Sequence, residues 1–120
     1  VVVQLSFQGK QGYLGRDADG WGRLVGRDDA TRLRLRMVDG QNYYGTDDDW
    51  WLSVGTTGTR AGYVSFYWWN NCGHPDWRYD RVTKRLTSSY SSRAGMSIRD
   101  DGYVYCWPSY PAADVELQEV

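Results

Sequence analysis

The sequence predicts an all-β protein that forms a single domain. Short segments in which apolar and polar residues alternate recur along the chain, separated by Gly, Asp, Asn and Ser. That period of two is typical of half-buried strands, whereas no stretch follows the 3.6-residue spacing of an amphipathic helix. The 120 residues fit one domain, because a second would be too small to bury a core of its own.

The expected strands of the first half lie between residues that favour turns. The first segment opens with β-branched residues, and the later ones alternate apolar or aromatic residues with polar ones. In chain order we expect strands at Val1–Phe7, Gly12–Asp17, Gly22–Gly26, Arg32–Val38, Gln41–Thr46 and Trp51–Gly55. The pairs Asp19-Gly20 and Asp39-Gly40 supply the positive φ angles that tight hairpins need.

The second half continues this pattern, with one irregular stretch. We expect strands at Gly62–Trp69, Lys84–Ser89, Gly95–Arg99, Gly102–Trp107 and Val115–Val120. Turns are expected at Thr57-Gly58, at Asn71-Cys72-Gly73 and at Asp101-Gly102. The segment Asn70–Arg81, which holds the only His of the chain, is predicted to be a long loop.

Three arginines alternate with two leucines within one expected strand, from Arg32 to Arg36. Because successive strand side chains point to opposite faces, the arginines share one face, and Leu33 and Leu35 share the other. A solvated arginine face over a half-buried leucine face is the favoured interpretation. A stripe that binds phosphate or acidic groups is the alternative.

A pattern of six residues occurs twice in the chain. Gln-x-Tyr-x-Gly-x-Asp-x-Asp-x-Trp begins at Gln11 and returns at Gln41, an offset of 30 (41 − 11). With one residue deleted, the copies extend to Val25-Gly26 and Val54-Gly55, an offset of 29 (54 − 25). A third copy is fainter, and in it the stretch Ser88–Ser92 takes the place of the acids and the tryptophan.

These copies divide the chain into approximate units 1–40, 41–80 and 81–120. Repeats spaced by about 20–50 residues indicate a repeat architecture. Three units in an all-β chain favour a β-trefoil, in which the repeats close a barrel that hairpins cap. A β-prism or a β-sandwich is the alternative.

The first unit contains Tyr13-Leu14-Gly15-Arg16-Asp17. This segment resembles the trefoil lectin and fascin-like group, whose units commonly have Tyr-Leu followed by a small and an acidic residue. The resemblance implies a trefoil fold. No Gln-x-Trp occurs, so the sugar contacts of the ricin-type family are not expected. The repeat is also partly similar to the Gln-x-Asp-x-Asn repeats of bulb-type mannose lectins, which implies the β-prism alternative.

The repeated residues are those that a sugar site needs. Carboxylates accept hydrogen bonds from vicinal hydroxyls, and indole rings pack on the C–H face of a sugar. Strand alternation places the tyrosine and the two acids of each copy on one face. The candidate carbohydrate-binding residues are Tyr13, Asp17, Asp19 and Trp21 in one site and Tyr43, Asp47, Asp49 and Trp51 in the other.

Other chemistry is less favoured. The acidic runs Asp17–Asp19 and Asp47–Asp49 contain oxygen ligands for Ca²⁺, but neither has the full calcium loop with a distant Glu, so no cofactor is expected. An enzyme is not expected either. His74 is the only histidine, and the chain has no G-x-S-x-G segment and no histidine cluster for a metal.

The composition restricts the partners. A net charge of −1 gives no basic face for nucleic acid, and no apolar run approaches the ~20 residues of a membrane span. Seven Trp and ten Tyr against two Phe suit surfaces that are half apolar and half wet. Glycans or glycoproteins are therefore the expected partners, and a homo-oligomer is a further possibility.

Cys72 and Cys106 are the only two cysteines. A single disulfide in a secreted, extracellular protein is the favoured interpretation, and two buried free thiols are the alternative. We thus expect a secreted lectin with two shallow sugar sites, a pairing that would give avidity. The alternative is a secreted protein-interaction module, such as a toxin subunit, effector, inhibitor or self-assembling subunit, that uses exposed Tyr and Trp.

Overall fold

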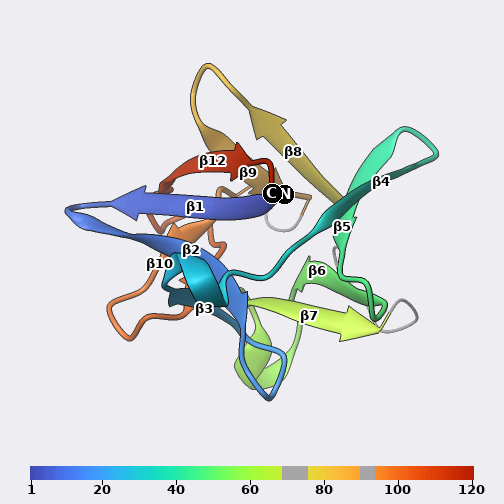
Figure 1. Ribbon diagram of the computed structural model, residues 1–120. Helices are drawn as coiled ribbons and strands as arrows, with labels where there is room; N and C mark the ends of the chain where they lie inside the picture. Colours follow the sequence, from blue (N-terminus) through green and yellow to red (C-terminus); the bar gives the residue numbers. More distant parts are fainter. Residues whose placement is uncertain (69–75, 90–93) are drawn as a thin grey trace.

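The computed structural model describes residues 1–68, 76–89 and 94–120. In these ranges the chain forms strands and two short 3₁₀ turns, and no helix is long and apolar enough to cross a membrane. The strands pair antiparallel in several sheets of one compact domain. The prediction of an all-β protein is therefore confirmed (Figure 1).

Strands β1 to β12 follow one another along the chain. Their bounds are β1 (Val2–Phe7), β2 (Lys10–Arg16), β3 (Gly22–Val25), β4 (Arg34–Val38), β5 (Gln41–Gly45), β6 (Trp50–Val54), β7 (Val64–Trp68), β8 (Asp76–Asp80), β9 (Arg85–Ser88), β10 (Ser97–Ile98), β11 (Val104–Tyr105) and β12 (Asp114–Gln118). The 3₁₀ turns are η1 (Arg27–Asp29) and η2 (Gly58–Arg60).

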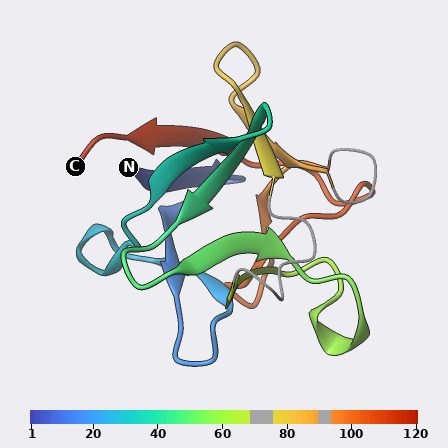
Figure 2. The same ribbon diagram turned by 90° about the vertical axis from the view of Figure 1, so that its right-hand side faces the viewer.

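Six of the strands follow one another in a ring. The pairs β12–β1, β4–β5, β5–β8 and β8–β9 form regular ladders. Val1 and Leu33 close one gap, since each donates its backbone nitrogen to the carbonyl of the other, at 2.7 and 2.8 Å. The Val115 N–H closes the other by donating to the Lys84 carbonyl at 2.8 Å. Figure 2 shows β1 and β12 side by side.

Three hairpins, β2–β3, β6–β7 and β10–β11, contact one another in a cycle. Each hairpin donates one backbone hydrogen bond to a glycine carbonyl of a neighbouring hairpin. The three bonds run from Phe66 N–H to Gly20 O at 2.7 Å, from Cys106 N–H to Gly62 O at 2.8 Å and from Leu24 N–H to Gly102 O at 2.8 Å. The three glycines have φ angles of 84°, 83° and 85°, a region that only glycine enters without strain. Each hairpin thus uses the same backbone geometry to hold its neighbour.

The core lies inside this arrangement and is built from inward-facing strand residues. Its largest fully buried side chains include Trp77, Phe66, Leu5, Leu14, Leu52 and Leu86. The indole N–H of Trp77 donates to the Leu52 carbonyl at 3.1 Å, so the buried ring leaves no polar atom unsatisfied. Trp77 belongs to β8, within the segment predicted to be a loop. That prediction is wrong for 76–80, because Trp77 and Tyr79 alternate inward and pair the segment with β5 and β9.

Strand β4 departs from the expected half-buried pattern. Leu33 is buried, but Leu35 is 53% exposed and Met37 69% exposed. The β4–β5 hairpin projects away from the body of the domain, so only its base reaches the core (Figure 1). The predicted Asp39-Gly40 turn is confirmed at its tip, where both residues have positive φ.

Cys106 is a buried free thiol that donates to the Ala94 carbonyl at 2.9 Å. Burial raises the pKa of the thiol to about 12. Cys72 lies outside the described residues. The predicted disulfide therefore finds no support, and the alternative of buried free thiols fits Cys106.

Candidate functional site

The turn between β2 and β3 is built around Asp17. Its Oδ1 accepts hydrogen bonds from the backbone N–H groups of Asp19 and Trp21, both at 2.9 Å. The Asp17 N–H donates to the Trp21 carbonyl at 3.0 Å, and Gly20 supplies the positive φ that closes the turn. One carboxylate oxygen of Asp17 is thus committed to the backbone, while the Asp19 side chain is exposed.

The turn between β5 and β6 repeats this arrangement with Thr46 in the place of Asp17. The Thr46 hydroxyl accepts from the Trp50 N–H at 3.0 Å, and the Thr46 N–H donates to the Trp50 carbonyl at 2.8 Å. Asp49, at φ 66°, takes the position of the turn glycine. Trp50, at an offset of 29 (50 − 21), is therefore the counterpart of Trp21.

A third turn of this kind joins β10 and β11. The Arg99 N–H donates to the Tyr103 carbonyl at 2.8 Å, and the Gly102 N–H donates back to Arg99 at 3.0 Å. This turn contains two acids, Asp100 and Asp101, followed after Gly102 by an aromatic residue, Tyr103, whereas the sequence pattern places the third copy of the turn at Ser88–Ser92. The turn therefore has the same two backbone hydrogen bonds as the β2–β3 and β5–β6 turns.

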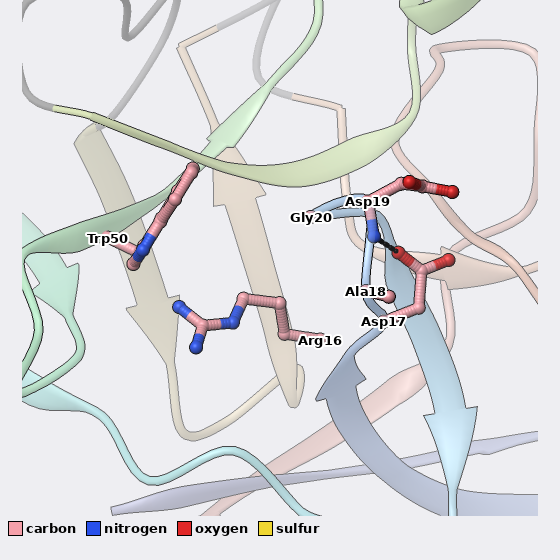
Figure 3. A pocket seen from close by; sticks show the side chains of 6 residues that line it. All are labelled: Arg16, Asp17, Ala18, Asp19, Gly20 and Trp50. Atoms are coloured by element: carbon pink, nitrogen blue, oxygen red, sulfur yellow. Dashed lines mark hydrogen bonds between the residues drawn. The ribbon is translucent and has the colours of Figure 1, made fainter.

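A pocket of about 360 Å³ lies where the first two turns meet; we call it the turn pocket. It is lined by Arg16, Asp17, Ala18, Asp19, Gly20 and Trp50. Figure 3 shows Trp50 on one side, the aspartates on the other and the Arg16 guanidinium between them, directed at the indole. The Asp19 carboxylate is directed away from Arg16, and no described residue pairs with it (Figure 3).

Arg16 connects the walls of the turn pocket. Its guanidinium lies 5.5 Å from the centre of the Trp50 ring and contacts both carboxylate oxygens of Asp48, at 3.4 and 3.2 Å. The pKa of the Asp48 carboxyl is lowered, first by the hydrogen bond from the Thr46 hydroxyl and second by Arg16. The pocket therefore presents a fixed arginine beside an aromatic ring.

Trp50 is half-buried at the edge of the core and packs on its cross-strand neighbour Trp68. The two ring centres are 4.4 Å apart with an interplanar angle of 33°. Trp68 is 50% exposed, so the aromatic surface extends beyond the turn pocket. An apolar ring beside exposed carboxylate and guanidinium groups is suited to a ligand with both apolar and hydroxyl faces.

Of the eight candidate residues from the sequence, Asp17 and Asp19 line this pocket. Tyr13 lies elsewhere: its hydroxyl donates to Gln118 at 3.3 Å and accepts from Arg27 at 3.2 Å. Trp21 is half-buried and contacts Tyr63 and Tyr103 rather than the turn pocket.

The second set of candidates does not line the turn pocket. Tyr43 and Trp51 are buried, at 8% and 6% exposure, because they lie on a covered face of β5 and β6. Asp47 pairs with Arg34 at 2.9 Å, and Asp49 holds the turn. Trp51 is thus a packing residue, and Trp50 is the tryptophan that lines the turn pocket.

Arg16, Asp48 and Trp50 are the site residues that sequence reasoning missed. One signal could have found Trp50, since the offset of 29 between Val25-Gly26 and Val54-Gly55 also relates Trp21 to Trp50. Calcium has no evident position: in 1–68, 76–89 and 94–120, no three His, Cys, Asp or Glu side chains group closely enough to hold a metal ion.

A second aromatic cluster covers the centre of the three hairpins. Trp21, Tyr63 and Tyr103 contact one another with ring centres 5.0, 5.4 and 5.8 Å apart. We call these three residues the aromatic cap. Each ring carries one arginine: Arg60 at 4.4 Å on Trp21, Arg23 at 4.3 Å on Tyr103 and Arg99 at 5.3 Å on Tyr63.

Comparison of the chain with protein-family models, with curated proteins and with solved structures finds no match. A functional assignment must therefore come from the geometry of the turn pocket and its surroundings.

Proposed function

We propose that this chain is a carbohydrate-binding protein whose sugar site is the turn pocket. The observation that carries the proposal is the junction of two turns, which places the Asp17–Asp19 turn across the pocket from the Trp50 indole with the Arg16 guanidinium between them. A sugar ring has one apolar C–H face and hydroxyls at its edge. The Trp50 indole fits the first, and the Arg16 guanidinium, with the exposed Asp19 at the rim of the pocket, fits the second.

The sequence predicts two equivalent sugar sites, one in each copy of the pattern. The turn pocket is instead a single site to which both turns contribute. The first turn contributes the aspartates, and the second contributes Trp50 and, through Asp48, the position of Arg16. A single shallow site of about 360 Å³ suits a mono- or disaccharide, and its affinity would be weak without avidity. Secretion and self-association into a homo-oligomer stay predictions from the sequence.

We also propose that the architecture is a β-trefoil. Three observations support it: the ring of six strands, the cycle of three hairpins and the equivalent glycines at φ 83° to 85°. Strands β1 to β4, β5 to β8 and β9 to β12 fall within the three units into which the sequence divides the chain. A prism or a sandwich gives no reason for hydrogen bonds that run from each hairpin to the next in a cycle.

A protein-interaction module remains the second candidate, and the aromatic cap favours it. Tryptophan, tyrosine and arginine dominate the energetics of protein interfaces, and the aromatic cap with its three arginines has this composition. Trp107, 36% exposed, extends the same surface through Tyr105. Such a partner would bind on the aromatic cap, which does not include Trp50.

Binding to a broad glycan array, followed by titration of the best oligosaccharide, tests the sugar proposal. Trp50→Ala should weaken binding at least about tenfold, as expected when a central aromatic contact is removed. Trp107→Ala, a tryptophan outside the turn pocket, is the matched control and should bind as the parent does. Absence of any array signal, or equal loss in both variants, would contradict the proposal.

A further inference from the structure

A second pocket of about 360 Å³ lies beside the turn pocket, in the loop between β6 and β7. It is lined by Val54, Gly55, Thr56, Thr57, Gly58, Thr59, Arg60 and Tyr67. We call it the threonine pocket. It adjoins the turn pocket through one contact: Arg60 donates from Nη2 to the backbone carbonyl of Asp19 at 2.6 Å.

The loop that forms the threonine pocket is closed on itself. The Gly55 N–H donates to the Tyr63 carbonyl at 3.0 Å, and the Gly62 N–H donates to the Gly55 carbonyl at 2.9 Å. Gly55 is needed for this closure, because a Cβ there would lie 2.2 Å from the Arg60 carbonyl oxygen. The closed loop therefore fixes the position of the Arg60 Cα, from which the side chain extends.

Aromatic rings then fix where the Arg60 guanidinium lies. Its central carbon is 4.4 Å from the centre of the Trp21 ring and 5.7 Å from that of Tyr67. The residue is only partly exposed, and no carboxylate of the described residues lies within 4 Å of its guanidinium. Asp19, the nearest acid in the hydrogen-bond network, offers its backbone carbonyl instead of its side chain.

A half-buried guanidinium without a carboxylate partner is well suited to bind an anion. Arginine has five N–H donors, only one of which is used here, and its planar fork matches carboxylate and sulfate oxygens. Partial burial reduces screening by water, so a charge-assisted hydrogen bond at this position is stronger than on an open surface. Three threonines, Thr56, Thr57 and Thr59, also line the pocket, and a threonine hydroxyl can donate a hydrogen bond to an anion.

We propose that the threonine pocket binds an anionic oxygen group, a sulfate ester or a carboxylate, carried by the same glycan whose neighbouring ring occupies the turn pocket. The glycan part of this inference rests on the proposed function, whereas the anion site stands on Arg60 and its loop. The substrate class is thus a sulfated or carboxylated oligosaccharide.

Inorganic sulfate tests the anion site directly, without a sugar. Titrated into ¹⁵N-labelled protein at low ionic strength, sulfate should shift the amide signals of Thr56 to Thr59 and the Nε–H signal of Arg60. Arg60→Gln should weaken binding at least about tenfold, because it removes a charged hydrogen-bonding group. Arg60→Lys keeps the charge but loses the planar guanidinium. Its affinity for sulfate should lie between those of the parent protein and of Arg60→Gln.

Arg23 provides the matched control for this titration. It lies 4.3 Å from the Tyr103 ring and donates to the Asp101 carbonyl at 3.5 Å, as Arg60 does to Trp21 and Asp19, but it does not line the threonine pocket. Arg23→Gln should leave sulfate binding unchanged. Shifts centred on Arg32–Arg36, or equal loss in the Arg23 and Arg60 variants, would overturn the site.

Matched glycans on the array separate this inference from the proposed function. Sulfated and sialylated oligosaccharides should bind more tightly than their neutral parents, and Arg60→Gln should abolish only the difference. Binding of neutral glycans that depends on Trp50 but gains nothing from an anionic group would overturn the inference and leave the proposed function standing. Sulfate binding that depends on Arg60 without any glycan signal would overturn the proposed function and the glycan part of the inference.

Discussion

At the scale of single residues, the two neighbouring tryptophans of β6 have different roles. Trp50 is half-buried beside Arg16 and Trp68, whereas Trp51 is 6% exposed on the opposite face of the strand. A shift of one residue exchanges the two faces of a strand, so the register of the repeat decides which indole can meet a ligand. The hydrogen bonds of the turn set that register at Trp50.

The two aspartates of the turn pocket should respond differently to mutation. Asp17→Ala removes the acceptor of two backbone N–H groups, and we expect a loss of about 1–3 kcal/mol in the free energy of unfolding. Asp19→Ala removes an exposed carboxylate and should change stability by less than about 0.5 kcal/mol while weakening sugar binding. Urea unfolding measures both, and a similar loss in the two variants would refute this division of roles.

The carboxyl of Asp48 offers a test of how Arg16 is held. Its pKa, measured by NMR titration, should lie below the usual range for Asp, and Thr46→Val should raise it more than Arg16→Gln does, because the hydroxyl is the larger cause. Thr46→Ser, which keeps the hydroxyl, is the control. Since the folded-state pKa is lowered, the contacts of Asp48 stabilise the fold above its unfolded-state pKa and are lost as the pH falls through the folded value. The reverse order of the two variants would contradict this assignment.

At the scale of elements, the hairpins β2–β3, β6–β7 and β10–β11 each contain a glycine with nearly the same positive φ, but the neighbours of these glycines differ. Gly62→Ala and Gly102→Ala both force alanine into positive φ, which costs about 1–2 kcal/mol. The Cβ at 62 would also lie 2.7 Å from the Tyr105 ring, whereas at 102 the nearest atom is an Arg23 nitrogen at 3.6 Å. We therefore expect the Gly62 variant to lose more stability, by about 1 kcal/mol or more, in thermal unfolding. Equal losses would show that the contact with Tyr105 relaxes freely.

Most strands could be predicted from the sequence, since alternation and Asp-Gly turns act locally. Strand β8 could not, because Trp77 and Tyr79 stand between polar and turn-forming residues, and only their pairing with β5 and β9 fixes the strand. The exposure of Leu35 was equally hidden, because alternation gives the face of a side chain but not whether another element covers that face.

The candidate site could be predicted only in part. Asp17 and Asp19 were recognisable as a repeated acidic turn, whereas Arg16, Asp48 and Trp50 meet through contacts between residues 32 and 34 positions apart (48 − 16 and 50 − 16). The residue pattern returns at an offset of 30, whereas the turn hydrogen bonds relate Asp17 to Thr46 and Trp21 to Trp50 at an offset of 29 (46 − 17 and 50 − 21). A one-residue change of this kind is set by turn hydrogen bonds, which the residue pattern does not display.

At the scale of the whole molecule, the cycle of three hairpins carries two distinct surfaces. The aromatic cap and its arginines lie at the centre of the hairpins, and the turn and threonine pockets lie beside Arg60, where the first two units meet. That junction combines the Asp17–Asp19 turn with Trp50 of the second turn. The proposed site therefore needs both turns.

The central claim is that a sugar ring stacks on Trp50 in the turn pocket. The most direct measurement is an isotope-filtered nuclear Overhauser experiment on labelled protein saturated with the best-binding oligosaccharide. We predict contacts between sugar C–H protons and the indole protons of Trp50, with weaker ones to Trp68, and their disappearance in Trp50→Ala. Contacts confined to Trp107 or to the β4–β5 hairpin, with none to Trp50, would contradict the account.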